Sequence, residues 1–208
     1  MEFRSSGVVL RKQNYGEADR ILRIFTQEMG MVSAIAKGVK KIKSRKGGSL
    51  ELFSEVNLRL MRKLGELFLI TEVASKQHPD FTLPQLAVTY KIAEWILALL
   101  PPEKPFPEIY ELLQVVFKVI PKTEKLSLVE LAFGVKFFND LGYLRNPEDY
   151  KDKIRKLLKF LITAQFREIL RLEEDTVTFN EVNRILIGIY ETETNKTSRV
   201  EINTRGWK

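Results

Sequence analysis

The first third of the chain alternates between short apolar runs and turn residues, a pattern that is typical of β-strands. One run has a clear period of two, with Val56, Leu58 and Leu60 on one face and mostly polar residues on the other. A Leu-Gly-Glu connection at residues 64–66 follows it and predicts a tight hairpin. The five predicted strands cover residues 7–12, 20–26, 31–36, 52–63 and 67–73.

Five short strands with hairpin links and one longer loop suit a small closed barrel of the OB type. Closure removes exposed strand edges, which are sites of aggregation. We therefore predict an all-β OB-type barrel over residues 1–78, followed by an all-α helical domain over residues 79–208. A small open sandwich is the competing architecture for the strands.

From Thr82 onward, apolar residues recur at helical spacing, and Pro107 opens a second helical stretch. The apolar stripe expected to face the core from the first helix comprises Leu86, Tyr90, Ala93, Leu97 and Leu100.

Later helix boundaries follow from capping patterns and apolar spacing. Capping-box patterns at Ser127–Glu130 and Thr178–Glu181 predict two helix starts. Residues 150–172 carry one continuous apolar stripe and predict a single long amphipathic segment.

The composition excludes several kinds of functional site. Without cysteine the chain has no disulfide, thiolate metal site or cysteine nucleophile, and its one histidine, His78, cannot form a cluster. Phosphate-binding glycine motifs are absent, and the acidic run at 173–175 fits a solvated turn better than a metal site. Four aromatic residues at helical spacing fit core packing: Trp95, Phe133, Phe137 and Phe138. We therefore predict a protein that is not an enzyme, with no cofactor, metal or small-molecule substrate.

The sequence also argues against a membrane protein. Its first seven residues lack the apolar region of a secretory signal, and polar residues interrupt the apolar stretch at 83–100. We expect a cytoplasmic protein.

Positive charge is concentrated in the first third of the chain. Residues 1–78 hold 15 Lys and Arg against 8 Asp and Glu, whereas the other 130 residues hold 19 of each. The excess centres on residues 37–46, here called the basic segment, which carries six cations and no acidic residue. A localised basic surface on a neutral body is typical of a polyanion-binding protein, although a solvated loop is the simpler alternative.

Single-stranded nucleic acids are held by cations along the phosphates and by aromatic rings beneath the bases. Besides the basic segment, the first third supplies cations at Arg11, Lys12, Arg20, Arg23, Arg59, Arg62 and Lys63. The predicted phosphate contacts are Lys37, Lys40, Lys41, Lys43, Arg45, Lys46, Arg11, Arg20 and Arg59. Tyr15 is the predicted stacking residue, because it lies beside a glycine turn among polar residues.

Several ordered motifs in the first quarter of the chain resemble the RecO family of recombination mediators. They are Gly7-Val-Val-Leu10, Tyr15-Gly-Glu-Ala-Asp-Arg20, Phe25-Thr26, Gly30, Ala36-Lys-Gly-Val-Lys-Lys41, Lys43-Ser-Arg45, Gly47-Gly-Ser-Leu50 and Phe53. Farther on, only fragments such as Phe137-Phe-Asn-Asp-Leu-Gly142-Tyr143 match.

The resemblance implies a nucleoid-associated protein that binds single- and double-stranded DNA and anneals complementary strands. It also implies cooperation with RecR and single-strand-binding protein in loading RecA. Many family members carry a four-cysteine zinc element after a Leu-Gly-Tyr segment, and this chain has no cysteine. Residues 144–152 are expected to form a short metal-free connection instead.

Two other functions remain open from the residues alone. One is an RNA-binding OB module on a helical scaffold, since composition does not report recognition of the 2′-hydroxyl. The other is a membrane-surface protein whose basic segment binds anionic lipid.

Overall fold

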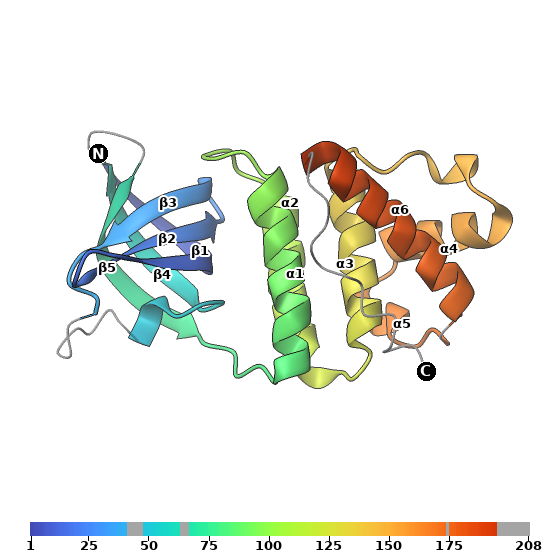
Figure 1. Cartoon of the computed structure of the whole chain (residues 1–208), viewed down its shortest axis with the longest axis horizontal. Coiled ribbons are helices and arrows are strands. Elements are labelled where there is room, and N and C mark those ends of the chain that lie inside the picture. The colour runs from blue at the N-terminus through green and yellow to red at the C-terminus, as the bar shows by residue number, and fades with distance from the viewer. Residues whose placement is uncertain (41–47, 63–66, 174, 195–208) are drawn as a thin grey trace. The chain divides into compact units, whose positions relative to one another are not determined.

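The computed structural model describes residues 1–40, 48–62, 67–173 and 175–194. Contacts divide the chain into two compact units (Figure 1). The barrel unit comprises Met1–Asp80 together with Leu100–Tyr110, and the helical unit comprises Phe81–Leu99 and the residues from Glu111 onward.

The strands close into a barrel in the order β1-β2-β3-β5-β4. Their bounds are β1 Glu2–Tyr15, β2 Asp19–Thr26, β3 Gly30–Ala36, β4 Glu55–Arg62 and β5 Phe68–Gln77. All neighbouring pairs are antiparallel except β3 and β5, which run parallel. The predicted closed OB-type barrel is therefore confirmed, and the open sandwich is wrong.

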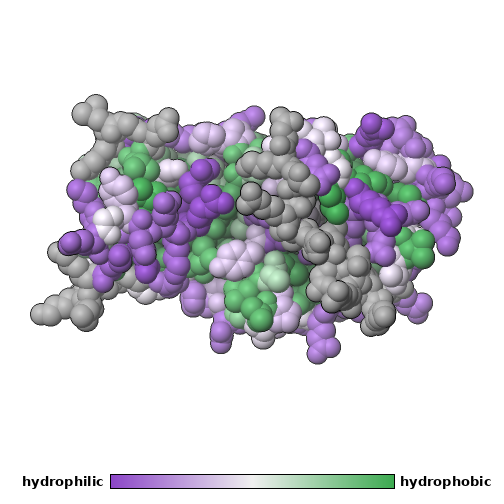
Figure 2. Space-filling model, in the orientation of Figure 1, coloured by the Kyte–Doolittle hydropathy of each residue, from purple (hydrophilic) through white to green (hydrophobic). Residues whose placement is uncertain are grey.

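The barrel core follows the period of two predicted from β4. Val56, Leu58 and Leu60 are buried in it with Leu22 and Ile24 of β2. On the outer surface of the barrel, hydrophilic side chains lie beside hydrophobic ones on the face in view (Figure 2). The predicted hairpin at 64–66 lies outside the described residues.

Residues 100–110 pack on the barrel, an arrangement that strand and helix periodicity do not reveal. Pro102 forms a parallel bridge with Met31 of β3, and the Glu103 N–H donates to the Met31 carbonyl at 2.9 Å. The Tyr110 ring meets Phe25 edge-on, with centroids 5.6 Å apart. Because Phe25 is on the outer side of β2, this segment covers an apolar part of the barrel surface.

The helices follow the barrel strands in the chain. Their bounds are α1 Leu83–Leu99, α2 Pro107–Val119, α3 Leu126–Asp140, α4 Asp152–Thr163, α5 Phe166–Ile169 and α6 Thr176–Thr194. Short 3-10 turns occur at η1 Gly48–Leu50, η2 Ile120–Lys122 and η3 Pro147–Asp149. The predicted short connection at residues 144–152, between α3 and α4, contains η3.

Aromatic packing forms the centre of the helical unit, as predicted. Trp95 of α1 stacks on Phe133 of α3 with ring centroids 6.2 Å apart, and Phe137 and Phe138 extend the cluster. The same helices are joined by a buried ion pair between Lys91 and Glu130. The Tyr190 hydroxyl donates to the Glu94 carboxylate at 3.1 Å. Burial of Tyr190 and this neighbouring carboxylate raise the pKa of Tyr190 to about 12.

The apolar stripe expected on α1 is wrong in part. Tyr90 is 54% exposed, whereas Val88, Ile92 and Ile96 are buried. Apolar residues lie on nearly every side of α1, so spacing alone does not identify the face that packs.

Both predicted capping boxes are wrong. Helix α3 begins one residue before Ser127, with Lys125 at its N-cap, and no side chain caps it. In α6, Asp175 takes the capping role, because its carboxylate accepts from the Thr178 N–H at 3.3 Å and from the Thr178 hydroxyl at 2.7 Å. Asp175 immediately precedes Thr176, the first residue of α6, and an aspartate at the N-cap is as favourable as the threonine that the pattern indicated.

The single segment predicted over residues 150–172 is interrupted. Ala164 and Gln165 are extended, with ψ of 151° and 154°, and they separate α4 from α5. The Gln165 N–H donates to the Glu168 carboxylate at 2.9 Å, which begins α5 anew. The apolar stripe continues through the break, so periodicity does not show it.

Candidate nucleic-acid interface

Strand register places four residues on one outer surface of the barrel, here called the β1–β2 face: Arg11, Gln13, Tyr15 and Arg23. Leu22 and Ile24 point into the core, so the alternating neighbour Arg23 points outward. Arg11 lies directly opposite Arg23 in the ladder and therefore shares its face. A register shift between Val9 and Arg11 sets this alignment.

Tyr15 ends β1 and is 55% exposed, as a stacking residue must be. It precedes the turn that contains Gly16, whose φ of 58° suits glycine. The predicted stacking candidate thus lies at one end of the β1–β2 face, four residues from Arg11.

The start of the basic segment is hydrogen-bonded to this same turn. The Lys40 N–H donates to the Ala18 carbonyl at 2.9 Å, and the Gly38 N–H donates to the Asp19 carboxylate at 2.7 Å. Val39 is buried in the barrel core, while Lys37 and Lys40 are exposed. The structure therefore brings Lys37 and Lys40 to the β1–β2 turn, next to Tyr15.

Arg20 takes part in an ion network with Glu51 and Lys12. Its guanidinium donates to the Glu51 carboxylate at 3.0 Å, and the Lys12 ammonium pairs with the other carboxylate oxygen. Burial acts to raise the pKa of Glu51, but the hydrogen bonds and charges of Lys12 and Arg20 outweigh it and lower that pKa. The charge of Arg20 is thus partly neutralised.

Arg59 lies on β4, which pairs with the first half of β1, where Arg59 is opposite Arg4. It pairs with Glu72 at 3.0 Å and with Glu2 at 3.7 Å. It also lines a pocket of about 510 Å³, shared with Arg4 and Glu28. The mixture of cations and carboxylates there offers little net attraction to a polyanion.

Four predicted contacts, Lys41, Lys43, Arg45 and Lys46, lie outside the described residues. Arg23 also belongs to the β1–β2 face; it is one of the cations noted in the first third but is not in the set of predicted phosphate contacts. The alternation of β2 could have indicated its outward direction, but its position opposite Arg11 depends on the irregularity in β1.

The described part of the chain offers neither a metal-binding cluster nor a membrane-spanning helix. No group of three or more His, Asp or Glu side chains is placed to hold a metal ion among those residues. None of the helices within the described ranges is long and apolar enough to cross a membrane.

The molecule thus belongs to the class of proteins in which an OB-type barrel precedes a helical unit. Two sequence models of one family match it: Recombination protein O N terminal over residues 1–78, and Recombination protein O C terminal over residues 81–148. The chain therefore belongs to the RecO family, and the resemblance drawn from its motifs is confirmed.

Curated relatives named DNA repair protein RecO support the assignment. The protein from Rubrobacter xylanophilus is 35% identical over 146 residues, covering 68% of this chain and 58% of the relative. That from Dehalococcoides mccartyi is 28% identical over 159 residues, covering 76% and 63% respectively. A Streptomyces griseus relative is 49% identical over 65 residues, which are 31% of this chain and 26% of the relative. The matched part thus spans less than two thirds of each of these relatives.

Proposed function

We propose that this RecO family member is a DNA repair protein that binds DNA and anneals complementary strands during recombinational repair. The observation that carries the proposal is the concentration of positive charge in the barrel sequence: residues 1–78 hold the whole net charge of +7. Family membership supports DNA as the polyanion, since its curated relatives are named DNA repair proteins. Such a role would place the protein at the nucleoid.

The cations differ in how available they are. We assign phosphate contacts to the basic segment, with Lys37, Lys40, Lys41, Lys43, Arg45 and Lys46, and to Arg11 of the β1–β2 face. Tyr15 is assigned to base stacking. Arg20 and Arg59 contribute less, because carboxylates already hold their guanidinium groups.

Annealing in this proposal needs no turnover chemistry. Base pairing supplies the recognition between strands, so the protein has only to gather two strands and reduce their mutual repulsion. Phosphate contacts position a strand without specifying its sequence, and mixed-sequence oligonucleotides of equal length should therefore bind alike. Cooperation with RecR, single-strand-binding protein and RecA is proposed from the family resemblance.

An annealing assay tests this function. We expect the variant K40A/K41A/K43A/R45A to anneal complementary oligonucleotides more slowly than the parent, because both strands lose neutralisation. A matched control, K118A/K151A/K153A/K156A, removes the same charge from exposed helical positions and should anneal at the parental rate. A folded barrel variant that anneals as fast as the parent would contradict the proposal.

Competition separates the remaining alternatives. Matched DNA and RNA oligonucleotides and anionic vesicles should compete for the labelled strand, with DNA the strongest competitor. A clear preference for RNA or for vesicles would favour the RNA-binding module or the membrane-surface protein instead.

A further inference from the structure

Two arginines face each other on the β1–β2 face. Arg11 of β1 and Arg23 of β2 are directly opposite in the ladder, and Ser33 of β3 lies on the other side of Arg23. Arg11 is exposed, whereas Arg23 is half-buried. Side chains opposite each other in an antiparallel pair have Cβ atoms about 5 Å apart, and the charge of Arg11 acts on the Arg23 guanidinium.

This arrangement is unfavourable in the free protein. Burial and the charge of Arg11 lower the pKa of the Arg23 guanidinium. The Arg23 Nε is buried and makes no hydrogen bond within the described chain. Like charges directly opposite in a sheet are destabilising, and a buried unsatisfied donor carries a desolvation cost.

Three of the four other arginines in the described part of the barrel unit pair with a carboxylate; the exception, Arg4, is exposed. Arg20, Arg59 and Arg62 each pair with a carboxylate, supplied by Glu51, Glu72 and Glu103 respectively. Neither Arg11 nor Arg23 forms an ion pair with an acidic residue of the described chain, even though Arg23 is partly desolvated. Two like charges on neighbouring strands without an acidic partner favour the binding of an anion.

We propose that Arg11 and Arg23 form a fixed binding site for one phosphate group of a nucleic-acid strand. The site rests on the proposed strand-binding function and adds a residue, Arg23, and a location to it. The bound phosphate would supply the missing acceptors and neutralise the repulsion between the two guanidinium groups. Arginine forks are suited to phosphate because their N–H groups can donate in pairs.

The neighbouring residues favour a nucleic acid over an acidic protein segment. Tyr15 is exposed on the same face, four residues along β1, or about 13 Å at the usual rise of an extended strand. That length corresponds to about four nucleotides at the 3.4 Å spacing along one strand of a duplex, and to fewer in a stretched strand. One strand can therefore engage the arginine pair with a phosphate and Tyr15 with a base.

The site is tested by comparing the single-strand affinities of R23Q, R155Q and the parent. R155Q removes the same charge from an arginine of the helical unit that pairs with Glu148 and Asp152. We expect R23Q to bind a fluorescent oligonucleotide about tenfold more weakly, as for the loss of a charged hydrogen bond, and R155Q to change affinity less than about twofold. R23K should retain an intermediate affinity, because it keeps the charge without the fork.

Thermal unfolding separates a binding role from a structural one. We expect R23Q to melt at the parental temperature or above it, since the substitution removes an unpartnered buried donor and a repulsion. Parental affinity in R23Q, or equal losses in R23Q and R155Q, would overturn the arginine site while leaving strand binding intact. A lowered melting temperature with weakened binding would overturn it in favour of a structural role. Absence of strand binding by the parent itself would overturn the proposed function and the site together.

Discussion

Gly30 shows how a single residue lets residues 100–110 reach the barrel. Its φ is 69°, and a Cβ built there would lie 1.8 Å from the Lys104 carbonyl oxygen. Gly16 has a similar φ of 58° but open space around it. The two positions therefore share a left-handed backbone conformation that suits glycine, and they differ in contact.

Alanine substitutions at Gly16 and Gly30 should separate the cost of a left-handed backbone from the cost of a close contact. We expect G16A to lower the free energy of unfolding by about 1 kcal/mol, the usual cost of a left-handed residue with a Cβ. G30A should cost about 1–3 kcal/mol more, because the Lys104 backbone must also move. Chemical denaturation of both variants measures the difference, and equal losses would show that residues 100–110 do not approach Gly30 as described.

Glu51 gives the barrel a defined response to acid. Its pKa is lower in the folded chain than in the unfolded one, so its carboxylate stabilises the fold above its ordinary pKa of about 4.3. This stabilisation is lost as the pH falls through the lower, folded pKa. Denaturation curves between about pH 6 and pH 3 should therefore show a weaker pH dependence in E51Q than in the parent. Identical pH dependence in the two proteins would show that Glu51 gains nothing from Lys12 and Arg20.

E51Q should weaken the fold but strengthen the binding of a single strand. Glu51 holds Lys12 and Arg20 by ion pairs, so E51Q releases two cations at the barrel end. We expect a higher single-strand affinity and a steeper salt dependence in E51Q, measured at neutral pH. Unchanged affinity would place Arg20 outside the path of the strand.

At the scale of elements, close helix packing in the helical unit depends on Gly134 of α3. A Cβ there would lie 2.7 Å from Leu186 Cδ1 of α6 and 2.9 Å from Trp95 Cζ3 of α1. Gly188 of α6 has open space instead. We expect G188A to stabilise the protein by about 0.5–1 kcal/mol through helix propensity. G134A should destabilise it by about 1–3 kcal/mol through overpacking, which thermal or chemical unfolding can measure. Stabilisation by both substitutions would contradict the described packing of α3.

The strands were more predictable than the helix boundaries, for a physical reason. In β4, Val56 and Leu58 alternate with polar residues because one face is solvated, and this pattern is local in the sequence. In α1, neither Tyr90 nor Val88 is distinguished by polarity, so the packed face depends on distant residues such as Phe133. The break at Ala164 and the contact of Lys104 with Gly30 likewise depend on tertiary packing.

The candidate site was predictable in part. Tyr15 could be chosen because an aromatic residue beside a glycine turn is conspicuous, and its exposure agrees with that choice. Arg20 looked equivalent to Arg11 in sequence, yet only the structure shows that Glu51 pairs with Arg20. Nothing in the sequence singles out Arg23 among the cations of the first third, because its pairing with Arg11 follows from the register shift in β1.

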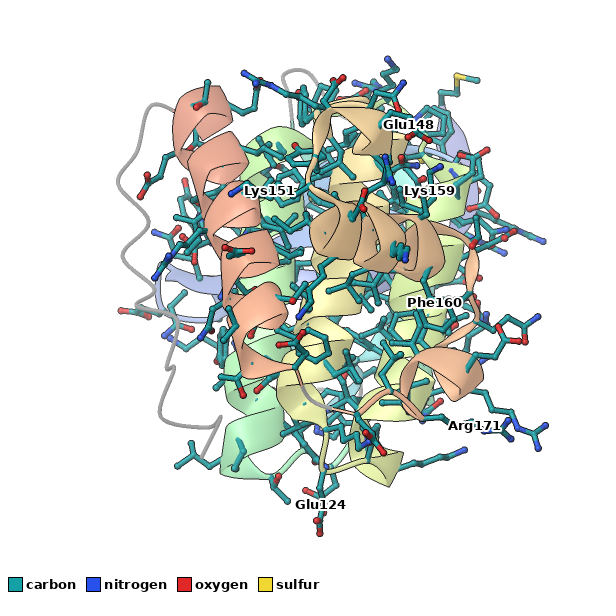
Figure 3. The ribbon with its side chains drawn as sticks, turned by 90° about the vertical axis from the view of Figure 1, so that its right-hand side faces the viewer. Glu124, Glu148, Lys151, Lys159, Phe160 and Arg171 are labelled. Atoms are coloured by element: carbon teal, nitrogen blue, oxygen red, sulfur yellow. The ribbon has the colours of Figure 1, made fainter. Side chains whose placement is uncertain are left out.

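At the scale of the whole molecule, the two parts of the sequence differ in net charge. Residues 79–208 hold equal numbers of cationic and acidic residues, and several of these pair with each other. Glu148 of η3 accepts from Lys159 of α4 (Figure 3). It also pairs with Arg155 of the same helix. The net positive charge therefore belongs to the barrel sequence, where the proposed DNA contacts lie.

The most direct test of the account is the salt dependence of single-strand affinity. If about six phosphates are neutralised, the slope of log K against log salt concentration should be near −4, at roughly 0.7 per contact. The K40A/K41A/K43A/R45A variant should reduce the magnitude of that slope by about 3. A parental slope indistinguishable from zero, or an unchanged slope in the variant, would contradict the claim that the basic barrel sequence binds the phosphates of DNA.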